Sequence, residues 1–134
     1  MRYMLLIYSQ ETAEMDAEDL SKIRAGHAHV MRETAEKGIL RGAEPLARTS
    51  TATTVRMEDG KPLITDGPFA ETKEQLAGYY ILDCRDLDEA IEWAAKIPTG
   101  CKGREGCIEI RPLPGLPRAP EYEEAAQQAP VGHG

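Results

Sequence analysis

The chain has 134 residues, with 16 basic and 23 acidic side chains and a formal net charge of −7. This length suits one domain, because single domains usually contain about 100–150 residues. The acidic balance argues against nucleic acid and anionic membrane surfaces as partners, and no apolar run approaches the roughly 20 residues of a membrane span. Three cysteines without a C-x-x-C pair suggest free thiols. We therefore expect a cytoplasmic domain.

The first half of the chain predicts a strand, a helix and a hairpin. Residues 3–8 (YMLLIY) are apolar at odd and even positions, so a strand here has both faces buried. A helical pattern covers residues 18–37, with Asp16 as its N-cap and Gly38 as its stop. After an extended segment, β-branched runs flank the Asp-Gly dipeptide at 59–60, which predicts a β-hairpin.

The second half predicts a strand, a second helix and a final strand. Residues 76–84 (LAGYYILDC) are the most strand-like segment, and residues 107–113 (CIEIRPL) form the last strand. Between them, Asp86 is the predicted N-cap of a helix, with Glu89 at the capping-box position and Pro98 as the stop. We expect this helix to bury four apolar residues: Leu87, Ala90, Ile91 and Ala94.

The order β-α-β, hairpin, β-α-β is typical of a ferredoxin-like α+β sandwich. We assign this domain to residues 1–113 and a mobile tail rich in Pro, Ala and Glu to residues 114–134. Two helices cover one face of such a sheet, yet the strand at 3–8 is apolar on both faces. The uncovered face therefore predicts a homodimer that packs sheet against sheet.

Several segments together resemble the DGPF-domain family, within the wider YCII-related group. The resemblance covers about residues 1 to 113 and is carried by TDGPFAETKE (65–74), QLAGYY (75–80), MRYMLLIY (1–8), TATTVR (51–56) and DLDEA (86–90). It implies a ferredoxin-like fold assembled as a dimeric α/β barrel. Most members of the family have no assigned reaction, and some are labelled as transcription-related.

The resemblance also implies a candidate acid–base residue. In smaller YCII-like relatives, a histidine on the first helix is paired with an aspartate as the proposed acid–base centre, and one relative is a dehydrochlorinase of a chlorinated aromatic. That histidine lies eleven residues before the glycine that ends the helix, which corresponds to His27 before Gly38. The hairpin with the DGPF signature looks like an addition to the smaller proteins.

His27 lies in the apolar stripe of the predicted helix, between Ile23 and Val30. It is either a partly buried structural histidine or an acid–base group that titrates near neutral pH. His29 points roughly 160° away on a helix, toward solvent. Because the two rings diverge and a third ligand is missing, we expect no metal at this pair.

The other candidates each have a structural alternative. Asp66 either closes the turn before Gly-Pro or orients His27, as the third member of a catalytic triad does. Phe69 either walls a pocket or plugs the barrel edge, and Lys73 either binds a charged group or pairs with a neighbouring glutamate. Tyr8 and Tyr80 either offer a hydroxyl to a substrate or serve packing.

These residues leave two main hypotheses open. The first is a small-molecule enzyme of the lyase, isomerase or dehydrochlorinase type, in which His27 is the acid or base; it needs no cofactor, and the sequence has no dinucleotide or phosphate-loop fingerprint. The second is a non-catalytic dimeric module that binds a ligand or a protein. A direct transcription role is a weaker third hypothesis, because the charge of −7 opposes DNA binding.

Overall fold

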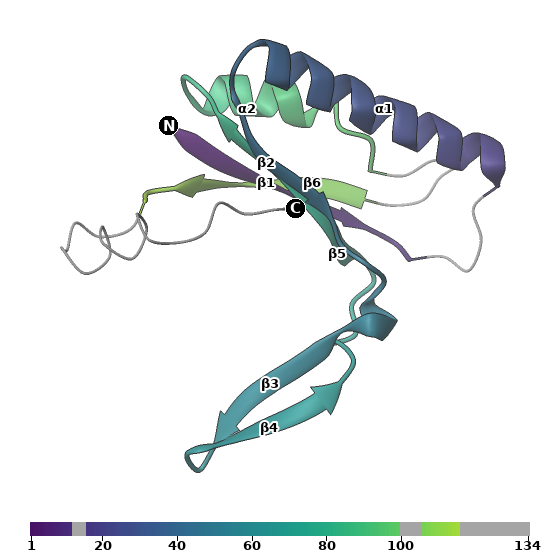
Figure 1. Ribbon diagram of the computed structural model, residues 1–134, viewed down its shortest axis with the longest axis vertical. Coiled ribbons are helices and arrows are strands. Elements are labelled where there is room, and N and C mark those ends of the chain that lie inside the picture. Colours follow the sequence, from purple (N-terminus) through teal and green to yellow (C-terminus); the bar gives the residue numbers. More distant parts are fainter. Residues whose placement is uncertain (12–15, 100–105, 116–134) are drawn as a thin grey trace.

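The computed structural model describes residues 1–11, 16–99 and 106–115. The elements follow the predicted order: β1 (Arg2–Ser9), α1 (Ala17–Glu36), β2 (Leu40–Pro45), the 3-10 turn η1 (Thr49–Thr51), β3 (Thr53–Glu58), β4 (Lys61–Asp66), β5 (Gln75–Asp83), α2 (Leu87–Ala94) and β6 (Gly106–Leu113). An antiparallel sheet has the strand order β2-β5-β1-β6, and β3 and β4 form a separate two-stranded sheet (Figure 1). The ferredoxin-like α+β prediction is confirmed.

Both helices lie on one side of the four-stranded sheet (Figure 1). On that side the odd residues of β1 are buried, and Leu5 has Tyr80 and Ile110 directly opposite on the two neighbouring strands. Directly opposite residues share a sheet face, so the register aligns one apolar layer across three strands. The core consists of Tyr3, Leu5, Ile7, Val30, Tyr80, Leu82, Cys84, Ala90, Trp93 and Ile97.

The other side of the sheet is not covered by the helices. Met4 and Leu6 of β1 point there because side chains alternate along a strand, and their opposite neighbours on β5 are Ile81 and Tyr79. All four side chains are partly exposed. We call this surface the open face. Residues 1–11, 16–99 and 106–115 thus leave it partly exposed, and a second copy packed against it stays a prediction.

The predicted ends of α1 are confirmed. The Asp16 carboxylate accepts a hydrogen bond from the Asp19 backbone N–H at 2.8 Å, which caps the first turn. At the other end, Gly38 has φ of 72°, a left-handed conformation that favours glycine and stops the helix.

The predicted buried face of α2 is partly wrong. Asp86 caps this helix as expected, since its carboxylate accepts from the Glu89 N–H at 2.9 Å. However, Leu87 and Ile91 are each 49% exposed. The side chains buried beside Ala90 are Trp93 and Ile97. This short helix has two apolar stripes, and only one of them can face the sheet. The stripe with Trp93 is buried because its side chain removes far more apolar surface from water than that of Leu87.

The hairpin predicted at 59–60 forms an arm, Thr53–Asp66, that consists of β3 and β4. Asp59 and Gly60 have φ of 52° and 77°, as the two central residues of a type I′ turn require. The arm leaves the ends of β2 and β5 and extends on the side of the sheet away from α1 and α2 (Figure 1).

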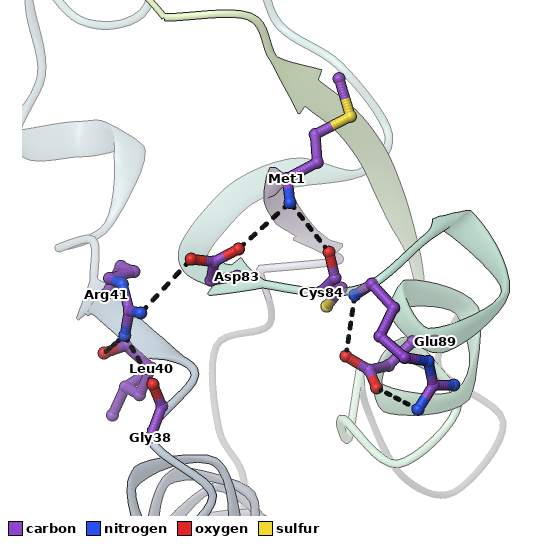
Figure 2. A network of polar contacts seen from close by, with 8 residues as sticks. Met1, Gly38, Leu40, Arg41, Asp83, Cys84 and Glu89 are labelled. Carbon is purple, nitrogen blue, oxygen red and sulfur yellow. Dashed lines mark hydrogen bonds and ion pairs between the residues drawn. The ribbon is translucent and has the colours of Figure 1, made fainter.

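A polar network joins three elements at the start of β1 (Figure 2). The Met1 ammonium donates to Asp83 Oδ1 at 3.2 Å and to the Cys84 carbonyl at 3.0 Å. Arg41 reaches the other oxygen of Asp83 at 3.3 Å and the Gly38 carbonyl at 2.8 Å. The hydrogen bond from the Met1 ammonium lowers the pKa of Asp83, and the positive charge of Arg41 lowers it further. This network ties β1, β2 and β5 together.

Most of the predicted tail lies outside the described residues. The predicted tail is described only at residues 114–115, so the boundary after residue 113 stays a prediction. Neither described helix combines the length and apolar character needed to cross a membrane. A cytoplasmic location also stays a prediction.

Candidate functional site

A cavity of about 600 Å³ lies between α1 and the β5 side of the sheet. This volume is within the usual range of small-molecule sites, roughly 300–1,000 Å³. Most of the exposed wall is apolar. The lining residues come from β1, α1, β2, β5 and the two segments that follow β1 and α2: Ile7, Ser9, Gln10, Ile23, Arg24, His27, Ala28, Met31, Ala43, Glu44, Pro45, Ala77, Gly78, Tyr79, Tyr80, Pro98 and Thr99. The cavity lies at the end of β1 opposite to the Met1 network.

His27 and Tyr80 form the central polar pair of this wall. His27 Nδ1 lies 2.8 Å from the Tyr80 hydroxyl, and the two rings are stacked with centroids 6.0 Å apart and planes 16° from parallel. The helical stripe directs His27 toward the sheet, and strand alternation places Tyr80 on the same face as Leu82. Fifty-three residues of sequence separate the two partners.

Burial favours the neutral form of both side chains, so it shifts their two pKa values in opposite directions. Desolvation lowers the pKa of His27 from its ordinary value. It raises the pKa of Tyr80 to about 12. At neutral pH the imidazole is therefore free to accept a proton, and the phenol keeps its proton and serves as a hydrogen-bond donor.

The hydroxyl of Tyr80 has a second acceptor within reach, the His27 backbone carbonyl at 3.5 Å. When the hydroxyl donates to Nδ1, the imidazole carries its proton on Nε2. When the hydroxyl turns to the carbonyl, Nδ1–H donates to the tyrosine oxygen and Nε2 has the free lone pair. The pair thus supports both tautomers of His27, and the second one leaves Nε2 as a base.

Four other candidate residues do not line this cavity. Asp66 is the last residue of β4, and its side chain is exposed. Phe69 is 75% exposed, and Lys73 is exposed. Tyr8 has Leu76 as its opposite neighbour on β5, on the open face. Among the described residues, the cavity wall contains His27 and Tyr80 but none of these four.

The sequence interpretation did not identify the hydrogen-bond partner that His27 has within one chain. It left Asp66 open as either a turn residue or the residue that orients His27, and it named Tyr80 only as a substrate-binding candidate, whereas the structure places the Tyr80 hydroxyl 2.8 Å from His27 Nδ1. One signal in the sequence was available: the alternation that buries Leu82 also buries Tyr80, and a buried tyrosine hydroxyl needs a hydrogen-bond partner. Arg24, one helical turn before His27, was also missed as a wall residue.

His29 lies on the surface, as predicted. Its Nε2 is 3.0 Å from a carboxylate oxygen of Glu33. In the described part of the chain, no three or more His, Cys, Asp or Glu side chains are grouped so that they could hold a metal ion. Cys84 is buried, and desolvation raises the pKa of its thiol to about 11, so it acts as a packing residue at neutral pH.

Comparisons with known proteins agree with this architecture. Residues 1–114 match the family model described as YCII-related domain. The chain is also similar to an uncharacterized protein of Rhizobium meliloti (strain 1021), with 37% identity over 115 residues. That alignment covers 84% of this chain and 92% of the relative.

Proposed function

We propose that this chain, which belongs to the YCII-related domain family, is a cofactor-independent acid–base enzyme for a small molecule. The resemblance to smaller YCII-like relatives supports the proposal, because it implies an acid–base histidine on the first helix. One observation carries the proposal: His27 is bonded to Tyr80 at 2.8 Å in the wall of a cavity of about 600 Å³. A neutral histidine, an apolar wall and a nearby hydroxyl are what proton abstraction from a carbon or oxygen atom needs.

In the proposed reaction His27 takes a proton from the substrate through Nε2. Tyr80 holds the ring by its bond to Nδ1, and its high pKa keeps the hydroxyl protonated throughout. The imidazolium then returns the proton to another substrate atom in an isomerisation, or to the departing group in an elimination. Tyr80 is therefore a positioning residue, and His27 is the catalytic base and acid.

The cavity wall favours a substrate with an apolar body. Ile7, Ile23 and Met31 contribute aliphatic surface, and Arg24 supplies a positive charge one turn from His27. Desolvation by such a wall strengthens each polar contact inside it. The alternative function is a non-catalytic ligand-binding module with the same cavity, in which His27 only contacts the ligand.

We also propose that the protein is a homodimer whose open faces pack against each other. Met4, Leu6, Tyr79 and Ile81 support this proposal, because they form an apolar layer that the two helices leave uncovered. Burial of such a layer against a second copy would remove it from water.

The enzyme proposal is tested by solvent deuterium labelling. The protein is incubated in D₂O with a pool of small metabolites, and mass spectrometry detects compounds that gain deuterium at carbon. We expect labelling by the wild type, loss of labelling in His27→Gln, and a rate about 10- to 100-fold lower in Tyr80→Phe. His29→Gln is the matched control and should label at the wild-type rate.

Two results would decide against catalysis. Equal labelling by His27→Gln and wild type would show that another group, or none, removes the proton. Metabolites that bind to the wild type but are never labelled or converted would favour the ligand-binding module.

A further inference from the structure

One face of the arm is apolar and exposed. The register of β3 and β4 places Val55 opposite Ile64 and Met57 opposite Pro62, so these four side chains share one face. Val55, Met57 and Ile64 are 59%, 69% and 65% exposed. Contiguous exposed apolar residues on a water-soluble surface mark a contact with another molecule.

The arm cannot be explained by its own stability. A two-stranded hairpin alone is marginally stable in water, and hairpins usually gain stability from a third strand or a packed helix. Both faces of the arm are largely exposed in the single chain. The described residues leave this apolar face exposed, and a partner surface would bury it.

The base of the arm is held in a defined position. The Gly67 N–H donates to the Ala52 carbonyl at 2.7 Å, and the Thr54 hydroxyl donates to the Gly67 carbonyl at 2.8 Å. Thr49 lies just before the arm in the chain. Its backbone N–H and its hydroxyl donate to the carboxylate of Glu11 at 2.7 and 2.8 Å. These bonds connect the root of the arm to the end of β1.

We propose that the apolar face of the arm packs against a second copy of this chain, beside the contact between the two open faces. The arm extends on the side of the sheet where that second copy would lie, away from the helices (Figure 1). Under two-fold symmetry each copy gives an arm and receives one, so both exposed faces are buried at once. This inference rests on the proposed homodimer and not on the proposed chemistry.

The area of the open face supports this assignment. Four strands about 4.8 Å apart and about eight residues long, at about 3.4 Å per residue, cover roughly 500 Å². A stable interface buries about 800 Å² on each partner. By the same spacings, two strands of six residues add roughly 200 Å². The arm thus adds roughly two fifths to the footprint that the open face presents to a second copy.

The test compares the two faces of the same arm. In Val55→Lys/Ile64→Lys, charges replace the apolar face; in the matched control Leu63→Lys/Thr65→Lys, they occupy the opposite face of the same strand pair. Sedimentation velocity gives the dimer dissociation constant of each protein. We expect the first variant to raise it about 100-fold or more, because buried unpaired charges oppose association, and the control to change it less than about threefold.

Hydrogen–deuterium exchange gives a second measurement on the unmodified protein. The backbone amides of the arm should exchange more slowly at concentrations where the wild type is dimeric than where it is monomeric. Circular dichroism of both variants checks that the sandwich is folded, and Leu6→Lys on the open face tests the sheet contact separately.

The outcomes separate the two proposals. If Leu6→Lys breaks the dimer while both arm variants dimerise like the wild type, the arm inference is overturned and the homodimer stands. A wild type that is monomeric at every concentration overturns both. An arm that is covered only when a different protein is added overturns the assignment to a second copy. The deuterium-labelling test of His27 is independent of all these results.

Discussion

The four-stranded sheet and the arm use similar residues for opposite purposes. In the sheet, Leu5 and Leu82 are fully buried beneath the helices, whereas in the arm Val55 and Ile64 are exposed. Both regions are antiparallel strands rich in apolar and β-branched residues. The difference shows that the residue pattern of a strand specifies its pleating and pairing. Whether its side chains are buried depends on whether another element packs against that face of the strand.

The largest expected effect comes from shortening one apolar side chain in each region to alanine. Leu82→Ala should lower the free energy of unfolding by about 2–5 kcal/mol, because it leaves a cavity in the core. Ile64→Ala on the arm should change it by about 0.5 kcal/mol or less at concentrations where the protein is monomeric. Urea denaturation measures both. Equal losses would show that the arm belongs to the same packed core as the sheet.

A second pair of substitutions tests whether the arm unfolds separately from the sandwich. Gly38 and Gly60 both have positive φ, 72° and 77°, and a Cβ at either position would meet no atom within 4 Å. Alanine should therefore cost about 1–2 kcal/mol locally at each position. We expect Gly38→Ala to lower the global stability by this amount and Gly60→Ala to leave it nearly unchanged.

The readouts for this pair are urea denaturation and amide exchange. Gly60→Ala should accelerate exchange only in β3 and β4, since a weakened turn opens the arm locally. A global loss of stability in Gly60→Ala as large as that in Gly38→Ala would show that the arm and the sandwich unfold as one unit.

The smallest expected effect concerns His27 and pH. Because burial lowers its pKa, the folded protein resists protonation of this ring more than the unfolded chain does. The unfolded pKa is about 6.5, so folding stability is full above that pH and falls as the pH drops through the folded pKa. His27→Gln should reduce this loss of stability between about pH 7 and pH 5.

Urea unfolding midpoints of the wild type and His27→Gln across this pH range measure the effect. An NMR titration of the His27 ring gives its folded pKa directly. A folded pKa at or above the ordinary value would contradict the desolvated site in the cavity wall.

The sequence by itself determined the local structure of this protein. Short-range interactions fix the cap at Asp16, the stop at Gly38 and the turn at 59–60, because each depends on a few neighbouring residues. The order of elements then sufficed to predict the ferredoxin-like sheet, and the DGPF segment sufficed to predict the family.

Only the tertiary structure decided which side chains meet. It gave His27 a hydrogen-bond partner 53 residues away in the sequence. It also turned α2 so that Trp93, and not Leu87, is buried. It placed Asp66 at the end of the arm strand β4 and outside the cavity wall. These outcomes depend on which apolar surfaces compete for the same space, and a pattern along one segment does not contain that information.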